Sequence, residues 1–374
     1  MNFIKYLGLR LYTLDNDKNN FYRAIRPLDE WMLPIIRIED NIFINFTETD
    51  YKITIGNIEC KIVKIPRLPF QIRIQELTRR QSLEIIKFLI NSVISCKKHD
   101  CIIHDIHEGN VLWWNKPIFV DLDAISTWNH ANCSLSFVRI CYLMYKYVFK
   151  RNINSHEDAC FEMLKTQGGW ASEQINRQFD DITLWHEFKN IVDSIKLPDH
   201  DKNLWSDDYA TSSVEELKNN PKIKKVIDLA PDGESMLDIG CNKGYMSHYF
   251  DNKYKYKLGF DNNESCIDKI KTSKNSNFAY FGIDNFKKIE PIPINERFYA
   301  DVVLALAVVH HFESIGLTID YIANTIAKLS KKYILIEDIT NYEEYDKIFI
   351  ENGFSIINRI ESYPAKRMLT LWKK

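Results

Sequence analysis

The sequence predicts an α/β protein whose C-terminal part forms a doubly wound sheet and whose N-terminal part is mainly helical after a small β region. From residue 236 to residue 372, short apolar runs alternate with helical spacers. Over residues 82–94 and 135–195, apolar side chains recur at helical intervals. Ahead of these, apolar and polar residues alternate on both sides of the turn-forming pair Gly56-Asn57. We therefore expect three parts, which are residues 1–65, 66–200 and 201–374.

Composition limits the classes of protein that the chain can represent. Hydrophobic residues make up 45% and charged residues 27% of the 374 residues, which is typical of a globular protein. The formal net charge of −2 indicates no basic surface for nucleic acid. No apolar run approaches the roughly 20 residues of a membrane span, and Asn2 and Lys5 interrupt any signal-peptide core. The eight cysteines lack regular spacing, which favours reduced thiols. We expect a cytoplasmic protein without a membrane span or a nucleic-acid partner.

In the N-terminal half, alternation predicts strands over residues 41–47, 51–55 and 58–65, which would form a small antiparallel sheet. A helix is expected from Ser82, as its N-cap, to Ile94. About three more helices are expected between residues 135 and 195. The polar stretch 197–208 reads as a linker.

The C-terminal half predicts a helix over residues 213–229 and then seven strands. Helical spacers separate the first five strands, and the last two resemble a hairpin, so the pattern indicates a doubly wound sheet. The expected strands are 236–240, 257–261, 278–282, 301–307, 333–337, 354–360 and 368–372.

The turn after the first of these strands is the central motif. The apolar run Met236–Ile239 reads as a buried parallel strand, and the turn after it contains Gly240 and Gly244. Glycine suits a sharp turn or a close approach to a ligand. A helix is expected from Tyr245, with its N-terminal N–H groups facing the turn. A dinucleotide fold is the alternative, but Asn242 replaces the second glycine of the G-x-G-x-x-G pattern that a pyrophosphate needs.

Polar side chains follow the next three strands at the same expected edge of the sheet. Asp261 ends the second strand, where a carboxylate accepts hydrogen bonds from ribose hydroxyls. Asp284 follows the third strand and could bond an adenine amino group. His310 and His311 follow the fourth. The motifs therefore converge on one crevice outside the carboxyl ends of the strands.

Over about residues 209–374, this set of motifs resembles the class I S-adenosylmethionine (SAM)-dependent methyltransferases. The resemblance implies a seven-stranded Rossmann-like sheet, SAM as the cofactor and no metal. Cys241 departs from the commoner alanine or glycine but is of similar size. The implied cofactor-binding residues are Asp238, Gly240, Cys241, Asn242 and Gly244 around the methionine part, Asp261 at the ribose, Asp284 at the adenine, and Asn262 and Asn285 beside them.

Methyl transfer from SAM requires an acceptor lone pair in line with the S–CH3 bond. A hydroxyl acceptor also loses a proton, and a histidine with a pKa near 7 can accept it. His310 or His311 is the candidate base, with His310 preferred. The alternative is that one of these histidines caps a helix or packs beside the cofactor.

The first half contains a second motif. Residues 104–110 fit the pattern H-D-x-x-x-x-N, and the run 119–123 reads Phe-Val-Asp-Leu-Asp. This arrangement is similar to the catalytic loop of protein-kinase-like folds, which implies a catalytic role for Asp105 and metal-binding roles for Asn110 and Asp121. No glycine-rich loop precedes the motif, so a degenerate, inactive relative of that fold is favoured. A zinc site is not favoured, because the cysteine and histidine spacing of residues 96–107 matches no standard structural site.

Residues 66–374 also resemble a bacterial group of methyltransferases related to the nodulation-factor fucose methyltransferase. The resemblance rests on residues 69–73, 103–110 and 117–125, on Trp205 and Tyr209 in the linker, and on the histidine pair. It implies O-methylation of a carbohydrate or glycoconjugate hydroxyl, with a small-molecule or glycan acceptor. The alternatives are an acceptor in RNA, protein or a small metabolite, and a non-catalytic SAM-binding or kinase-like scaffold.

Overall fold

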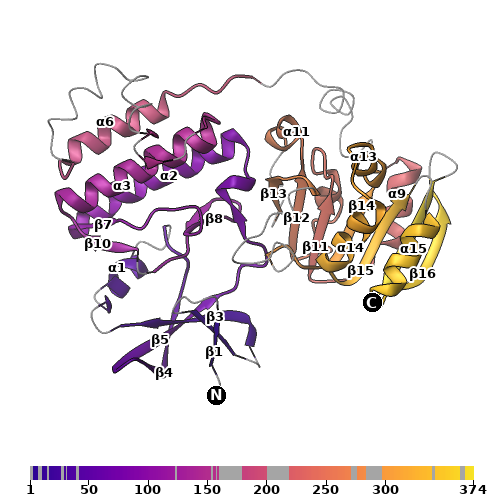
Figure 1. The fold of residues 1–374 in the computed structure, drawn as a ribbon, viewed down its shortest axis with the longest axis horizontal. Coiled ribbons are helices and arrows are strands. Elements are labelled where there is room, and N and C mark those ends of the chain that lie inside the picture. Colours follow the sequence, from indigo (N-terminus) through magenta and orange to yellow (C-terminus); the bar gives the residue numbers. More distant parts are fainter. Residues whose placement is uncertain are drawn as a thin grey trace. The chain divides into compact units, whose positions relative to one another are not determined.

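The chain divides into two compact units in the computed structural model (Figure 1). The N-terminal unit comprises Met1–Leu68 and Ile72–Pro198, and the C-terminal unit comprises Pro69–Gln71 and Asp199–Lys374. The described residues are 3–6, 11–14, 17–26, 29–30, 32–38, 42–122, 124–152, 155–156, 158–159, 179–199, 219–270, 276–283, 297–338, 342–362 and 367–374.

An antiparallel sheet opens the N-terminal unit, with strand order β1-β2-β3-β5-β4. The predicted hairpin around Gly56 is present, and Gly56 has the positive φ of 62° that such a turn requires. The predicted strand over 41–47 is wrong, because among the described residues 42–46 only Phe43 makes a bridge, to Phe119, and β4 begins at Thr47. The strands are β1 (Phe3–Tyr6), β2 (Leu11–Leu14), β3 (Asp17–Ile25), β4 (Thr47–Ile55) and β5 (Ile58–Pro66).

The long helix of this unit, α2 (Arg79–Cys96), begins earlier than predicted. Its N-cap is Thr78, whose side chain accepts a hydrogen bond from the Gln81 N–H, while the Gln81 side chain accepts one from the Thr78 N–H. This reciprocal pair is a capping box. Ser82, the predicted cap, is therefore buried inside the first turn of the helix.

The remaining helices and strands of the N-terminal unit are short. Five brief strands lie in residues 72–127. They form a three-stranded sheet, β6-β8-β9, and a β10-β7 pair. The elements are α1 (Met32–Ile38), β6 (Ile72–Arg73), 3-10 turns at Ile74–Glu76 and Lys97–His99, β7 (Cys101–Ile103), β8 (Val111–Trp113), β9 (Pro117–Phe119), β10 (Ile125–Thr127), α3 (His130–Leu143), a π-helical turn Met144–Val148 and α6 (Ile182–Asp193).

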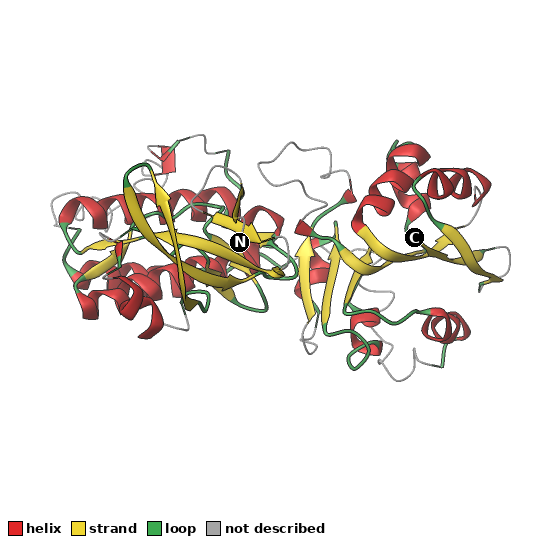
Figure 2. Cartoon of the chain, turned by 90° about the horizontal axis from the view of Figure 1, so that it is seen from below, coloured by secondary structure: helices red, strands yellow, loops and turns green. Residues whose placement is uncertain are grey.

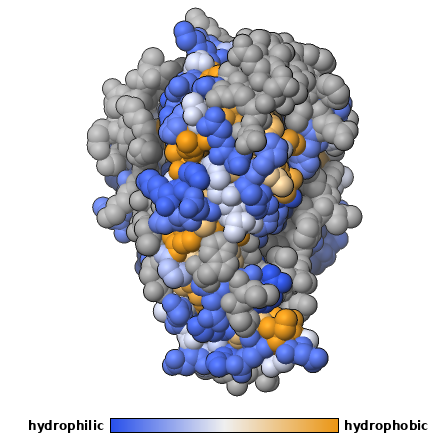
Figure 3. Space-filling model, turned by 90° about the vertical axis from the view of Figure 1, so that its left-hand side faces the viewer, coloured by the Kyte–Doolittle hydropathy of each residue, from blue (hydrophilic) through white to orange (hydrophobic). Residues whose placement is uncertain are grey.

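Hydrophilic side chains predominate on the face that Figure 3 presents, and hydrophobic ones form small separate groups among the described residues. No helix in the described ranges is both long enough and apolar enough to cross a bilayer.

The C-terminal unit contains the predicted seven-stranded sheet, in the order β13-β12-β11-β14-β15-β17-β16. Neighbouring strands are parallel except for β17, which runs antiparallel to both β15 and β16. All seven predicted strands are present, so the doubly wound sheet is confirmed. The strands are β11 (Ser235–Ile239), β12 (Tyr256–Asp261), β13 (Ser276–Tyr280), β14 (Ala300–Leu306), β15 (Ser330–Asp338), β16 (Ser355–Glu361) and β17 (Met368–Lys373).

Helices cover both faces of this sheet (Figure 2). The helices are α9 (Pro221–Leu229), α10 (Tyr245–Tyr249), α11 (Glu264–Asp268), α13 (Val309–Ser314), α14 (Ile319–Leu329) and α15 (Tyr342–Glu351).

The C-terminal part of the predicted helix over 213–229 is present as α9, which Asn220 caps and in which proline occupies the first turn. Residues 200–218, which include Trp205 and Tyr209 of the linker motif, lie outside the described ranges.

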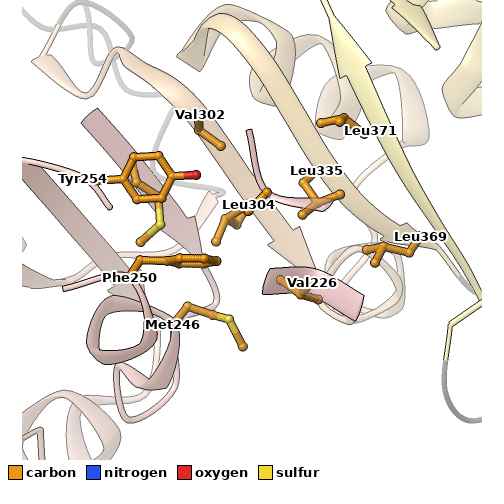
Figure 4. Packing of buried hydrophobic residues seen from close by; sticks show 11 residues of the cluster. Val226, Met246, Phe250, Tyr254, Val302, Leu304, Leu335, Leu369 and Leu371 are labelled. Carbon is orange, nitrogen blue, oxygen red and sulfur yellow. The ribbon is translucent and has the colours of Figure 1, made fainter. Parts of the chain in front are cut away.

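One face of the sheet packs through alternate side chains against α9 and α10. Val226 of α9 and Met246 of α10 lie in one buried cluster with Leu304, Leu335 and Leu371 from three neighbouring strands (Figure 4). Fully burying such side chains contributes about 1.5–3 kcal/mol each. The packing therefore fixes the loops at the carboxyl ends of the strands, where the motifs lie.

Candidate functional site

A pocket of about 650 Å³ lies at the carboxyl ends of the strands in the C-terminal unit. This volume falls within the range of about 300–1,000 Å³ that is common for small-molecule sites. Residues from the ends of β11, β12, β13 and β14 line it, together with the start of α9 and Arg367, which precedes β17. The location is the crevice where open α/β sheets bind their ligands.

The turn after β11 forms one wall of the pocket. Gly240 and Gly244 have φ values of 72° and 73°, and Asn242 has a φ of 48°. The left-handed region suits glycine and is tolerated by asparagine. The Gly240 and Cys241 N–H groups donate to the Phe260 carbonyl, at 2.9 and 3.2 Å. These bonds attach the turn to the end of β12.

Two glycines at this wall have no room for a side chain. A Cβ on Gly240 would lie 2.6 Å from Val308 Cγ2. A Cβ on Gly259, in β12, would lie 2.7 Å from Cys241 Cβ and 2.8 Å from its Sγ. Cys241 therefore fits at this position because β12 carries a glycine opposite it.

Two carboxyl groups lie under the same wall. Asp238 is 3% exposed, and burial raises its pKa to about 8, with a further contribution from the charge of Asp261. Burial also raises the pKa of Asp261, although backbone N–H groups oppose the effect. Asn242 N–H donates to Asp261 Oδ2 at 2.9 Å, and Asn263 N–H donates to Oδ1 at 2.8 Å. The Asp261 carboxylate is thus held rigidly while each oxygen keeps a second lone pair for a ligand.

His310 and His311 begin helix α13 and differ in their surroundings. Their ring centroids are 4.0 Å apart, and both residues line the pocket. Burial lowers the pKa of His310, as does the positive charge of His311 and Arg367. His310 Nδ1 is buried without a hydrogen-bond partner among the described residues. His311 instead interacts electrostatically with Asp261.

Charged residues that the sequence did not single out lie beside His310. Glu337, at the end of β15, is fully buried, and its Oε2 lies 2.6 Å from Lys222 Nζ. The Arg367 guanidinium is 3.8 Å from the same oxygen. Ser362 Oγ donates to Glu337 Oε1 at 2.6 Å. Lys222, Arg367 and His310 all line the pocket.

A second polar cluster lies in the N-terminal unit and contains the kinase-like motif residues. Asn110 Nδ2 donates to Asp105 Oδ2 at 3.2 Å and to Asp121 Oδ2 at 3.1 Å. The Arg139 guanidinium lies 2.9 Å from Asp105 Oδ1. Asp121 Oδ1 lies 2.6 Å from the guanidinium of Arg23, on β3. Folding therefore brings the three motif residues together, with a cation paired to each aspartate. Asp123 lies outside the described residues.

Residues 214–374 match the family described as "Methyltransferase domain". The C-terminal unit is a SAM-dependent methyltransferase domain. The protein is thus a transferase that uses SAM as its cofactor. No protein in the curated collection matches the chain.

Solved structures resembling part of the chain include three methyltransferases. One is the N-methyltransferase NodS from Bradyrhizobium japonicum WM9, with 14% identity over 42% of this chain and 99% of that chain, at a TM-score of 0.34. Another is a TehB-like SAM-dependent methyltransferase from Corynebacterium glutamicum, with 18% identity over 45% and 98%, at 0.35. The third is the magnesium protoporphyrin IX methyltransferase of Synechocystis PCC 6803 with bound SAM, with 12% identity over 60% and 99%, at 0.33.

In the methyltransferase domain, the described residues predicted for the site line the pocket, except Gly244. Gly244 instead serves as the left-handed N-cap of α10. Asp284 and Asn285 lie outside the described residues. The pocket-lining set is Asp238, Gly240, Cys241, Asn242, Asp261, Asn262, His310 and His311.

The charged pocket residues that the sequence did not indicate are Lys222 and Arg367. Their partner Glu337 does carry a local signal, because an acidic residue at the end of a buried strand faces the same edge as the recognised motifs. The two cations carry no comparable signal, since exposed lysine and arginine are common on any surface.

Proposed function

We propose that the methyltransferase domain transfers the SAM methyl group to a hydroxyl group of a carbohydrate or glycoconjugate. Bound SAM supplies an electrophilic methyl group, so the chain has to orient the acceptor and remove a proton. The observation that supports the proposal is that His310 lines the pocket and has a ring nitrogen, Nδ1, with no hydrogen-bond partner among the described residues.

The pocket residues fit SAM in three ways. The glycines at 240 and 259 let the turn pack closely against Val308 and β12, which holds the backbone of the turn at the wall of the pocket. We expect Asp261, whose oxygens keep free lone pairs, to accept hydrogen bonds from the ribose hydroxyls, and Asp238 to pair with the cofactor ammonium. The pocket needs no close pyrophosphate approach at Asn242, which agrees with a cofactor that has no phosphates.

In the proposed mechanism, His310 accepts the proton of the acceptor hydroxyl. Its lowered pKa keeps the imidazole neutral near pH 7, which is the form that can act as a base. His311 lies on the Asp261 side and helps to position the cofactor end of the site.

Calorimetric titration with S-adenosylhomocysteine, the demethylated product of the cofactor, tests the cofactor site. The wild-type chain should bind it, and Asp261→Ala should bind it at least about tenfold more weakly because it removes a charge-assisted acceptor. Folded wild-type protein that fails to bind would refute the cofactor assignment.

Transfer of labelled methyl groups tests the acceptor class. Label should enter the carbohydrate fraction rather than the RNA or protein fraction. His310→Ala should lower kcat by about 100-fold or more while cofactor affinity stays unchanged. Label in RNA, protein or a small metabolite would favour the alternative acceptors. Unchanged cofactor affinity together with no turnover by wild type on any fraction would favour a non-catalytic SAM-binding scaffold.

For the N-terminal unit, we infer a relation to kinase-like folds without phosphotransfer. Support comes from the contacts among Asp105, Asn110 and Asp121 and from the place of Arg23 on the third strand, where kinase motifs have a lysine. The Arg23 ion pair occupies the carboxylate that would otherwise hold Mg²⁺. Titration of Mg²⁺ and ATP should show no binding; ATP binding that Asp121→Ala abolishes would overturn this inference.

A further inference from the structure

We propose that the acceptor of the methyltransferase domain carries an anionic oxygen group, a carboxylate or a phosphate, that binds Arg367 and Lys222 next to His310. This inference rests on the proposed function, because it specifies the acceptor of the same site. It comes from the charges at the two ends of the pocket and from the way in which Glu337 is paired.

The positive charges around Glu337 exceed its single negative charge. Two cationic side chains share this one buried carboxylate, and only Lys222 is in close contact with it, at 2.6 Å. The second cation, Arg367, lies 3.8 Å away, beyond hydrogen-bonding distance. Within the part of the chain that the structure describes, the Arg367 guanidinium donates no hydrogen bond. The cluster thus keeps one net positive charge and a planar donor group.

The two cationic side chains are accessible from the pocket. The Lys222 and Arg367 side chains are 20% and 27% exposed, and both line the pocket. A half-buried guanidinium facing a cavity is suited to bidentate binding of a carboxylate or phosphate. Lys222 lies in the first turn of the nine-residue helix α9, whose positive end adds to the attraction for an anion.

Acidic and cationic side chains lie at different positions along the edge of the sheet. Asp261 ends β12 and Asp238 lies in β11, whereas His310 follows β14, Glu337 lies in β15 and Arg367 precedes β17. Strands are about 4.8 Å apart, so three strand spacings, or about 14 Å, separate the ends of β12 and β15. The acidic end complements the sulfonium and ammonium of SAM. The cationic end then complements an anionic acceptor, with His310 between them.

The proposed test titrates inorganic phosphate and, separately, acetate into full-length protein saturated with S-adenosylhomocysteine, at low ionic strength. Arg367→Gln should weaken binding of the preferred anion at least about tenfold, and Lys222→Gln should weaken it too. The preference between phosphate and acetate tells which group the acceptor carries. Arg359→Gln is the matched control, because Arg359 is paired with Asp346 and 22% exposed but is not among the pocket-lining residues.

Cofactor affinity is measured in every variant, which separates this proposal from the function on which it rests. Wild type that fails to bind S-adenosylhomocysteine refutes the cofactor site and therefore the proposed function. Cofactor binding without binding of either anion refutes only the anionic acceptor. Equal weakening in Arg359→Gln would show non-specific surface binding and overturn the proposal. Loss of cofactor affinity in Arg367→Gln or Lys222→Gln would also overturn it, since the cations would then serve the methionine carboxylate of the cofactor.

Discussion

Cofactor binding should depend on pH through Asp238. The pKa of this buried carboxyl group is raised to about 8, so it is about 90% protonated at pH 7 in the unliganded chain. If the cofactor ammonium pairs with it, the bound state contains the ionised form. Binding must then release about 0.9 proton at pH 7, and affinity should fall about tenfold, or about 1.4 kcal/mol, for each pH unit below 7.

Cofactor affinity should rise with pH because the free protein favours protonated Asp238 and the bound protein favours ionised Asp238. The free protein prefers the protonated acid, so raising the pH toward 8 removes a proton that the ligand would otherwise displace, and affinity rises. At a pH above the pKa of its own α-amino group, the cofactor loses the ammonium charge, and affinity should fall again. The expected affinity therefore rises with pH until Asp238 is ionised and falls once the cofactor amine is neutral.

The assay is calorimetric titration with S-adenosylhomocysteine between pH 6 and pH 9, in pairs of buffers with different ionisation enthalpies. Asp238→Asn should flatten the acid limb and abolish proton release at pH 7. Asp232→Asn, a fully exposed aspartate in the preceding loop, should retain both. A wild-type affinity that is constant from pH 6 to pH 8, with no proton release, would refute the reasoning.

The remaining predictions concern stability. Gly240→Ala should lower the free energy of unfolding by about 2–5 kcal/mol through backbone strain and steric overlap. Gly316→Ala, at φ 85° in open space, should lower it by about 1–2 kcal/mol through strain alone. Equal losses in chemical denaturation would contradict the steric argument. Gly259→Ala should cost about 1–3 kcal/mol and be partly rescued by Cys241→Gly, with a coupling energy of at least about 0.5 kcal/mol; strict additivity would exclude the contact. Thr78→Ala should cost about 1 kcal/mol through loss of the capping box, and an unchanged midpoint would show that the cap is dispensable.

The features that the sequence predicted well are local ones. The seven strands of the C-terminal unit and the turn at Gly240 follow from apolar periodicity and from glycine at a left-handed position, both of which are encoded within a few residues. The capping box at Thr78 is equally local, but the apolar repeat by itself predicts the cap at Ser82.

The features that could not be predicted depend on residues far apart in the chain. Arg23 meets Asp121 only because β3 folds next to the loop that follows β9. Glu337 gathers Lys222 and Arg367 from a helix before the sheet and from a loop near its last strand. Nothing in the local composition marks such pairs, since their geometry arises only when the sheet order is established.

Because Cys241 packs closely against Gly259, the reactivity of its thiol reports whether the turn after β11 has separated from β12. The Cys241 thiol is 5% exposed, and burial raises its pKa well above the ordinary value, so the folded turn should be inert toward alkylating reagents. Modification of this thiol then requires the turn to detach from β12. The rate of alkylation at Cys241 should therefore measure how often the turn detaches from β12. Cofactor binding should slow alkylation in proportion to the fraction of protein that is bound.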